Sequence, residues 1–262
     1  MSTSSVPRSP AARDYPLEQI AASIQDERRR VSVLGEVREL VFGAQDGLVS
    51  TLAVVAAVVG ASSDNRAVLV AGLAAAVAGI FSMAVGEYMG SKSQDEIFDW
   101  HLDDERREVV ERPAEAEAEV AWLFMEEGMP ADDAREVARL VARHPDSLLA
   151  TMVAKELGLT SALGRETVGS PLRGALVMGG AFAGGALVPV LPFLFAEGEG
   201  ALVLATLSTG GVLFAIGAVK ARWTARSWWA SGLEILSLAG FAGILGYLFG
   251  TVLPTLLGVG GW

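Results

Sequence analysis

AVLVAGLAAAVAGIFSMAVGEYMG, residues 67–90, decides the fold class of this chain. Its one charged residue is Glu87, and it is longer than the roughly 20 residues that a helix needs to cross the hydrocarbon core of a bilayer. Further apolar stretches of similar length lie at about residues 40–61, 172–196, 200–219 and 228–253. The chain is 52% hydrophobic, with a mean hydropathy of +0.42. We therefore expect an all-α polytopic membrane protein with five transmembrane helices, which excludes an ordinary soluble enzyme.

A strongly charged segment, residues 91–170, separates the second apolar stretch from the third. It holds 19 acidic and nine basic residues and so carries −10 of the chain's net charge of −11. Breakers at Pro113, 128–130 and 144–145 divide it into short helices, whereas nothing before Glu111 obliges the second spanning helix to end. We expect a cytoplasmic helical metal-binding domain inserted between helices 2 and 3. Its acidity favours cations as partners over nucleic acid.

These boundaries divide the chain into four parts. Residues 1–37 are expected to form a cytoplasmic tail and an amphipathic helix, residues 38–90 transmembrane helices 1 and 2, residues 91–170 the acidic domain, and residues 171–262 transmembrane helices 3 to 5. Basic residues gather before the first helix and between the fourth and fifth, which predicts a cytoplasmic amino terminus and an external carboxyl terminus. The excess of arginine over lysine indicates a high-GC bacterium and hence a plasma membrane, with a vacuolar membrane as the alternative.

Two carboxylates and a thioether are expected to meet inside the membrane. Asp46 lies in the first apolar stretch, where a carboxylate is costly unless it faces a partner or water. Met83 and Glu87 are four residues apart, on one face of the second helix and at about the depth of Asp46. A thioether beside carboxylates favours a transition metal over Mg²⁺ or Ca²⁺. We predict that Asp46, Met83 and Glu87 line a transport pathway. The alternatives are interfacial positions for the two acids and a packing role for the methionine.

A second set of candidate ligands recurs at helical spacing in the acidic segment. His101, Glu105, Glu108 and Glu111 follow at intervals of three and four residues, and the pairs Glu115/Glu119 and Met152/Glu156 are each four apart. Each group taken alone is typical of a solvated helix face. Uncompensated carboxylates repel one another, however, so the charge of −10 favours bound cations. The predicted metal ligands are Glu105, Glu108, Glu115, Glu119, Met152 and Glu156.

Three motifs resemble the vacuolar iron transporter family, in the manner of a bacterial-type member. They are FGAQDGLVS at 42–50, FSMAVGEY at 81–88, and Met152 followed by ELGL at 156–159, and the resemblance covers about residues 35–255. It implies a homodimer of five-helix subunits that exchanges cytoplasmic Fe²⁺ for protons along a path between the subunits. The positions that match the family's membrane site are Asp46, Met83 and Glu87, and those that match its cytoplasmic metal ligands are Glu105, Glu108, Glu119, Met152 and Glu156. Ala116 and Val153 depart from the family pattern, which has a glutamate and a methionine there.

The sequence thus predicts a secondary transporter that moves Fe²⁺ out of the cytoplasm and is not an enzyme. No cofactor is expected, because Fe²⁺ is the transported ion. Mn²⁺, Co²⁺ and Zn²⁺ are the other candidate ions. The other expected partners are protons and membrane lipid. Three alternatives stay open: a Mn²⁺ exporter on the same framework, a passive divalent-cation channel, and a membrane-anchored metal sensor. Ferroxidase activity is not expected, because Phe98 and Val141 stand where a Glu-x-x-His motif requires glutamate.

Overall fold

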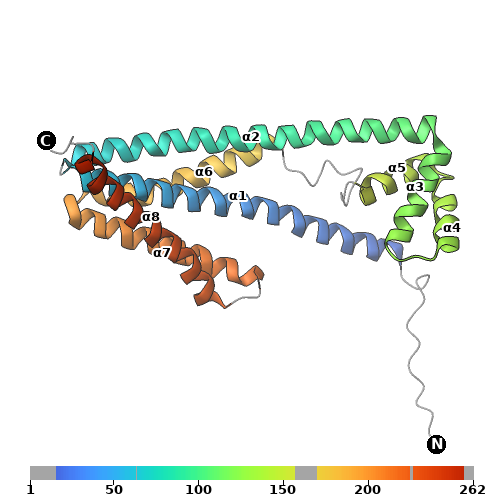
Figure 1. Ribbon diagram of the computed structural model, residues 1–262. Helices are drawn as coiled ribbons and strands as arrows, with labels where there is room; N and C mark the ends of the chain where they lie inside the picture. The colour runs from blue at the N-terminus through green and yellow to red at the C-terminus, as the bar shows by residue number, and fades with distance from the viewer. Residues whose placement is uncertain (1–15, 63, 157–169, 225–226, 257–262) are drawn as a thin grey trace, which may run out of the picture. The chain divides into compact units, whose positions relative to one another are not determined.

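The computed structural model describes residues 16–62, 64–156, 170–224 and 227–256, and every element in these ranges is a helix (Figure 1). The chain forms two compact units. One consists of Met1–Gly35 and Glu105–Gly169, and the other of Glu36–Asp104 and Ser170–Trp262. Two long helices, α1 (Leu17–Ala61) and α2 (Asn65–Glu111), contribute to both units.

The first helix is longer than expected. Instead of an amphipathic helix over residues 17–37 and a separate spanning helix from about Leu40, α1 is continuous from Leu17 to Ala61. Residues 17–61 contain no proline, and Gly35 by itself costs a helix only about 1 kcal/mol. The change from polar to apolar sequence near Val37 therefore alters the surface of the helix without ending it.

The turn between α1 and α2 falls where the sequence predicts it. The Ser62 hydroxyl accepts the Asp64 backbone N–H at 3.1 Å, and the Asp64 carboxylate accepts the backbone N–H of Arg66 at 2.9 Å. A side-chain oxygen that satisfies a free N–H of the first helical turn is the usual way to start a helix. From Asn65, α2 runs without interruption to Glu111, which confirms that the second helix continues into the acidic segment.

In the unit of Glu36–Asp104 and Ser170–Trp262, α1 and α2 pack with the later helices. These are α6 (Pro171–Val190), the short 3₁₀ helix η2 (Leu191–Leu194), α7 (Gly198–Thr224) and α8 (Trp228–Leu256). Small residues let the backbones approach closely: a Cβ added to Gly47 would overlap the Phe182 carbonyl of α6, and one added to Gly250 of α8 would overlap the Ala57 carbonyl of α1. Close glycine-mediated crossings of this kind are typical of membrane helices.

Four helices among the described residues are long and apolar enough to cross a membrane. The qualifying segments are Val37–Ala61, Asn65–Glu111, Pro171–Leu194 and Gly198–Ala221. In α8 the apolar stretch that the structure describes, Gly243–Val252, is shorter. The part of the chain that the structure describes is therefore all-helical, with at least four candidate spans.

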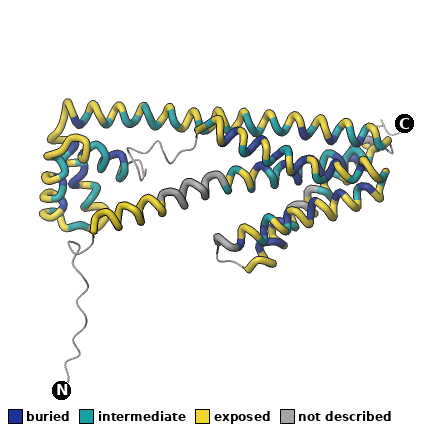
Figure 2. The backbone as a smooth tube through the Cα atoms, turned by 180° about the vertical axis from the view of Figure 1, so that it is seen from behind, coloured by how far each residue is buried: buried dark blue, intermediate teal, exposed yellow. Residues whose placement is uncertain are grey.

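In the unit of Met1–Gly35 and Glu105–Gly169, three short helices form a small bundle with the end of α2. They are α3 (Pro113–Glu126), α4 (Ala131–Val141) and α5 (Pro145–Glu156), so the predicted breaks are confirmed. Gly128 adopts a φ of +97°, a conformation that glycine adopts without strain, and thereby turns the chain between α3 and α4. Buried positions alternate with exposed ones along all three helices (Figure 2). Their core consists of Val109, Ala116, Val120, Ala121, Ala138, Leu148 and Met152.

Candidate metal sites

Asp46 on α1 and Met83 on α2 line the same pocket, which has a volume of about 220 Å³. Its other lining residues are Ser50, Val54, Ala75, Gly79, Ser82 and Phe182. Asp46 is the one titratable residue among them. A carboxylate and a thioether thus face one space, a donor pair that suits a transition-metal ion.

Phe182 of α6 forms a wall of this pocket because Gly79 has no side chain. A Cβ added to Gly79 would overlap the Phe182 ring, which is 3% exposed. The ring packs with Ala76 and Ala186, and Met83 lies against the same cluster. The glycine in α2 therefore fixes where the aromatic ring sits beside Met83.

Glu87 does not line the pocket that holds Asp46 and Met83. Its carboxylate accepts a hydrogen bond from the Ser91 hydroxyl at 2.8 Å, one turn further along α2. The structure therefore brings together two of the three predicted pathway residues and places the third one turn away from Met83 on the same helix.

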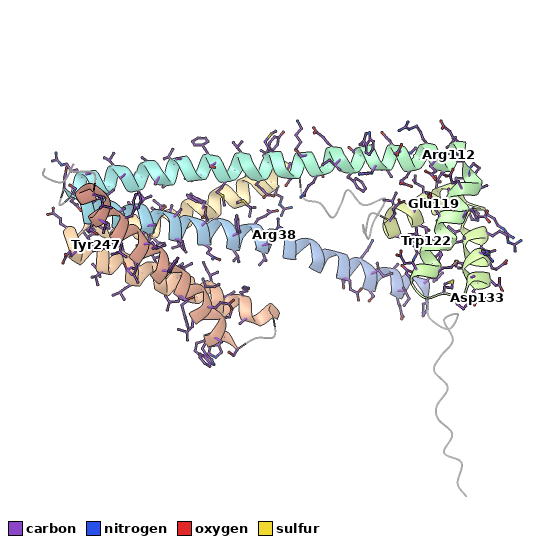
Figure 3. The ribbon with its side chains drawn as sticks, viewed as in Figure 1. Arg38, Arg112, Glu119, Trp122, Asp133 and Tyr247 are labelled. Atoms are coloured by element: carbon purple, nitrogen blue, oxygen red, sulfur yellow. The ribbon has the colours of Figure 1, made fainter. Side chains whose placement is uncertain are left out.

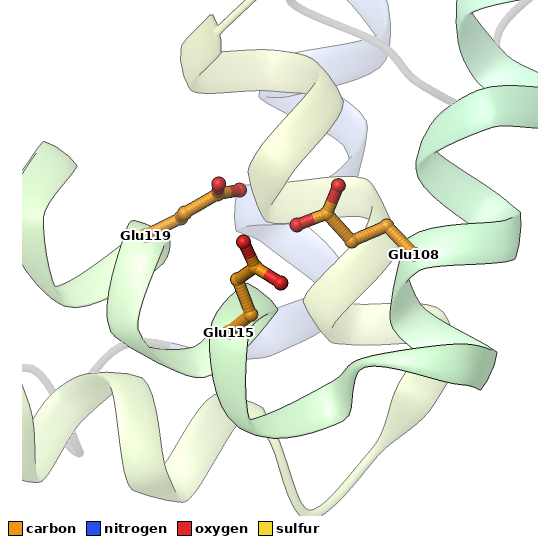
Figure 4. Close-up of side chains that lie close together, drawn as sticks. All are labelled: Glu108, Glu115 and Glu119. Carbon is orange, nitrogen blue, oxygen red and sulfur yellow. The ribbon is translucent and has the colours of Figure 1, made fainter.

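Glu108, Glu115 and Glu119 form a second candidate site, in the unit of the short helices. One carboxylate oxygen from each lies within 4.8 Å of the others, and the three side chains point toward one another (Figure 4). Glu108 comes from the last turns of α2, and the other two lie on α3. Pro113 explains the geometry, since it opens α3 at its first turn and forces the chain to change direction directly after α2.

Two further predicted ligands, Glu105 and Glu156, extend this cluster. Burial, together with the nearby carboxylates of Glu156, Glu108 and Glu119, raises the pKa of Glu105 to about 7. Burial also raises the pKa of Glu119, again helped by Glu108 and Glu156. One oxygen of Glu105 and one of Glu108 are buried with no hydrogen-bond partner among the described residues. A bound cation would relieve both the repulsion and the missing contacts.

Met152 lies in the hydrophobic core of the same bundle and is fully buried. The core also holds Val109 and Val120, the sequence neighbours of Glu108 and Glu119. His101 and Glu111 are outside the group formed by Glu108, Glu115 and Glu119. His101 packs edge-on against Trp100, with ring centroids 4.8 Å apart.

With both sites described, comparison with known proteins identifies the family. Residues 37–251 match the model of the VIT family. The chain belongs to the VIT family. It is similar to vacuolar iron transporter 1 of Oryza sativa subsp. japonica, with 29% identity over 80% of this chain and 82% of the relative. Vacuolar iron transporter 1 of Arabidopsis thaliana is 28% identical over 79% of this chain and 81% of the relative. The vacuolar iron transporter of Centaurea cyanus is 30% identical over 72% of this chain and 76% of the relative.

The resemblance to vacuolar iron transporters is thus confirmed, and the two departures from the VIT pattern can be located. Ala116 and Val153 are both fully buried in the small bundle. Glu115, the residue before Ala116, is 53% exposed at its side chain yet brings a carboxylate to Glu108 and Glu119. Both departing positions are therefore part of the core, and Glu115, the neighbour of Ala116, supplies the third carboxylate.

Arg112 is a residue of the cluster that the sequence reasoning did not select. Its guanidinium donates to Glu108 at 3.1 Å and to Glu115 at 2.9 Å (Figure 3 labels Arg112 and Glu119). The spacing of four and three residues from Arg112 was the available signal, because oppositely charged side chains at that spacing often pair on helices. Because the chain turns at Pro113, the two partners of Arg112 lie on different helices, Glu108 on α2 and Glu115 on α3.

Proposed function

We propose that this VIT-family protein carries Fe²⁺ out of the cytoplasm in exchange for protons, as a secondary transporter and not an enzyme. The observation that carries the proposal is the pocket lined by Asp46 and Met83, from two helices long and apolar enough to cross a membrane. The relatives' names as iron transporters support iron as the cargo.

The exchange is assigned to Asp46, since it is the titratable member of the pocket lining. A carboxylate oxygen binds a proton or a metal ion, so the two cargoes compete for one group. Met83 contributes a thioether, which favours Fe²⁺ over Mg²⁺ and Ca²⁺. Glu87, one turn from Met83, is assigned to the cytoplasmic end of the path.

The carboxylate cluster is assigned to metal capture. Glu105, Glu108, Glu115, Glu119 and Glu156 interact with one another without a matching number of cations, and the buried thioether of Met152 lies in the same bundle. Fe²⁺ and Mn²⁺ both accept such oxygen-rich sites. We place this domain, residues 91–170, in the cytoplasm, where it raises the local metal concentration.

A fifth spanning helix, α8, completes the proposed topology. Its 29 residues correspond to about 43 Å at 1.5 Å per residue, and its charged residue is Glu234. Five spans put the two termini on opposite sides of the membrane, and the basic loops assign the amino terminus to the cytoplasm and the carboxyl terminus to the outside. For this arginine-rich chain we assign the membrane to a bacterial plasma membrane.

A homodimer is the proposed assembly. The spanning segment of α2 is only 17% buried within the chain, and Val70, Val77, Phe81 and Val85 are each more than half exposed. Lipid or a second copy would cover such a surface in a membrane.

Metal uptake by proteoliposomes tests the function. Wild type should take up Fe²⁺ under anaerobic conditions, whereas Asp46→Asn, which keeps the side-chain shape, should reduce uptake at least tenfold, about the effect of 1.4 kcal/mol. Asp132→Asn on the exposed face of α4 is the matched control. Uptake that survives in Asp46→Asn would refute the assignment of the pocket. Metal binding without uptake in the wild type would identify a sensor.

A further inference from the structure

Arg112 occupies the corner between α2 and α3, within the carboxylate cluster. Its backbone N–H donates to the Glu108 carbonyl at 2.8 Å, which fixes the residue to the last turn of α2. Its φ and ψ of −133° and 54° lie outside the helical region and aim the chain toward Pro113. The guanidinium then reaches one carboxylate on each helix, Glu108 on α2 and Glu115 on α3.

The two carboxylates are among the three that converge within 4.8 Å. Arg112 uses one oxygen of each, Oε2 of Glu108 and Oε2 of Glu115. The other oxygen of Glu108, Oε1, is buried and has no hydrogen-bond partner among the described residues. The guanidinium thus holds the outer oxygens and leaves an inner oxygen available to a metal ion.

We propose that Arg112 is a tethered cation that competes with the metal ion for Glu108 and Glu115 and so keeps the capture site weak enough to release its cargo. This inference rests on the proposed capture of metal by the cluster. Arg112 is 56% exposed at its side chain, so its guanidinium can move into solvent when a divalent ion arrives. Arriving metal replaces a single charge on these oxygens by a double one.

Competition between Arg112 and the metal ion predicts that removing the guanidinium charge increases the affinity for metal. Removing the positive charge leaves the carboxylates and their unpartnered oxygen in place but removes the repulsion between guanidinium and metal. In a water-like dielectric, charges of +1 and +2 about 5 Å apart alter an equilibrium constant by about three- to tenfold at about 0.1 M salt. A purely structural Arg112 predicts the opposite sign, because losing it would separate Glu108 from Glu115 and weaken binding.

The test measures the Kd of Mn²⁺, an oxygen-stable probe, on the full-length protein in detergent. Asp46→Asn is the background of every sample, including the one called wild type, so that the membrane pocket does not contribute. Arg112→Gln and Arg112→Met should each bind Mn²⁺ about three- to tenfold more tightly than wild type. This difference in Kd should become smaller at high salt. Arg112→Lys keeps the charge and should stay within about twofold of wild type. Arg139→Gln is the matched control, because Arg139 forms an equally exposed pair with Glu136 on α4.

The outcomes separate the two proposals. Wild-type protein that binds no Mn²⁺ would overturn metal capture by the cluster, and the role of Arg112 with it. Binding in the wild type that is unchanged or weaker in both neutral variants would overturn the role of Arg112 alone. Tightening in Arg112→Lys equal to that in Arg112→Gln would also contradict a competition based on charge. Circular dichroism and thermal melting confirm that each variant is folded.

Discussion

At the scale of single residues, Glu105 shows how proton binding in the acidic cluster is coupled to the stability of the small bundle. Its carboxyl group is partly buried near Glu156, Glu108 and Glu119, and these surroundings raise its pKa from 4.5 to about 7. The folded protein therefore holds a proton on Glu105 over a pH range in which the unfolded chain does not. A metal ion placed among the same carboxylates would displace that proton.

The first prediction is a pH dependence of the small bundle. Because the folded state binds more protons between about pH 4.5 and 7, its stability should fall as the pH rises through this window. Hydrogen exchange of α3 to α5, corrected for intrinsic rates, should show greater protection at pH 5 than at pH 8 in metal-free protein. Glu105→Gln should flatten the dependence, and Glu136→Gln on α4 should not. Protection that rises with pH would contradict this account.

At the scale of elements, Lys155 connects the end of α5 to the end of α3. Its ammonium group pairs with Glu127 and lies 4.1 Å from the centre of the Phe124 ring. The lysine side chain is only 19% exposed, so the contact is better shielded than the surface pairs of α4. Glu156 follows Lys155 directly and is the last residue of α5.

The second prediction concerns this connection. Lys155→Met keeps the aliphatic stem but loses the ion pair and the cation–π contact, which together contribute about 1 kcal/mol. Hydrogen exchange in the last turn of α5 should accelerate about fivefold, and Mn²⁺ binding should weaken because that turn, which carries Glu156, opens more often. Arg135→Met, which breaks the exposed pair with Asp132, is the control. Equal exchange in the two variants would show that Lys155 has no such role.

The third prediction concerns the crossing of α2 and α6 at Gly79. Gly79→Ala should push Phe182 out of place and lower stability by about 1–3 kcal/mol, as overpacking does, with loss of metal uptake. Gly180→Ala on α6, where an added Cβ meets nothing within 4 Å, should be neutral or stabilising. Thermal melting in detergent compares the two. Restoration of stability by Phe182→Leu in the Gly79→Ala background would confirm the cause, whereas equal melting of both alanine variants would refute it.

Local sequence signals predicted the helices well and the contacts between them less well. Pro113, Gly128 and Pro145 marked the ends of the short helices, because proline and glycine act on the backbone of their own turn. The continuity of α1 was missed because a change from polar to apolar residues resembles a boundary although it breaks no hydrogen bond. Arg112 was not selected, although Glu115 was, since the partners of Arg112 depend on how the chain turns at Pro113. Spacing along α2 grouped Glu87 with Met83, but only Met83 lines the pocket with Asp46.

At the scale of the whole molecule, the number of spans decides which sides the two ends of the chain face. Four segments qualify among the described residues, and α8 is the proposed fifth. The absence of cysteine makes the question accessible, because each introduced thiol is unique.

The fourth prediction uses single-cysteine variants at exposed positions. Ser147→Cys should react with an impermeant maleimide from the cytoplasmic side, and Glu197→Cys and Leu256→Cys from the other. A chain with four spans would put Leu256 on the same side as Ser147, and labelling there would refute the fifth span. The unaltered chain, which has no thiol, is the control.

The central claim is that one carboxylate exchanges metal for protons. Its most direct test follows Fe²⁺ entry and internal pH together in anaerobic proteoliposomes of the wild-type protein whose cytoplasmic face points outward. The account predicts that Fe²⁺ entry is accompanied by proton exit, that an acidic interior accelerates both, and that both are lost in Asp46→Asn. Fe²⁺ entry at an equal rate with and without the proton gradient, and with no change of internal pH, would contradict it and identify a passive channel.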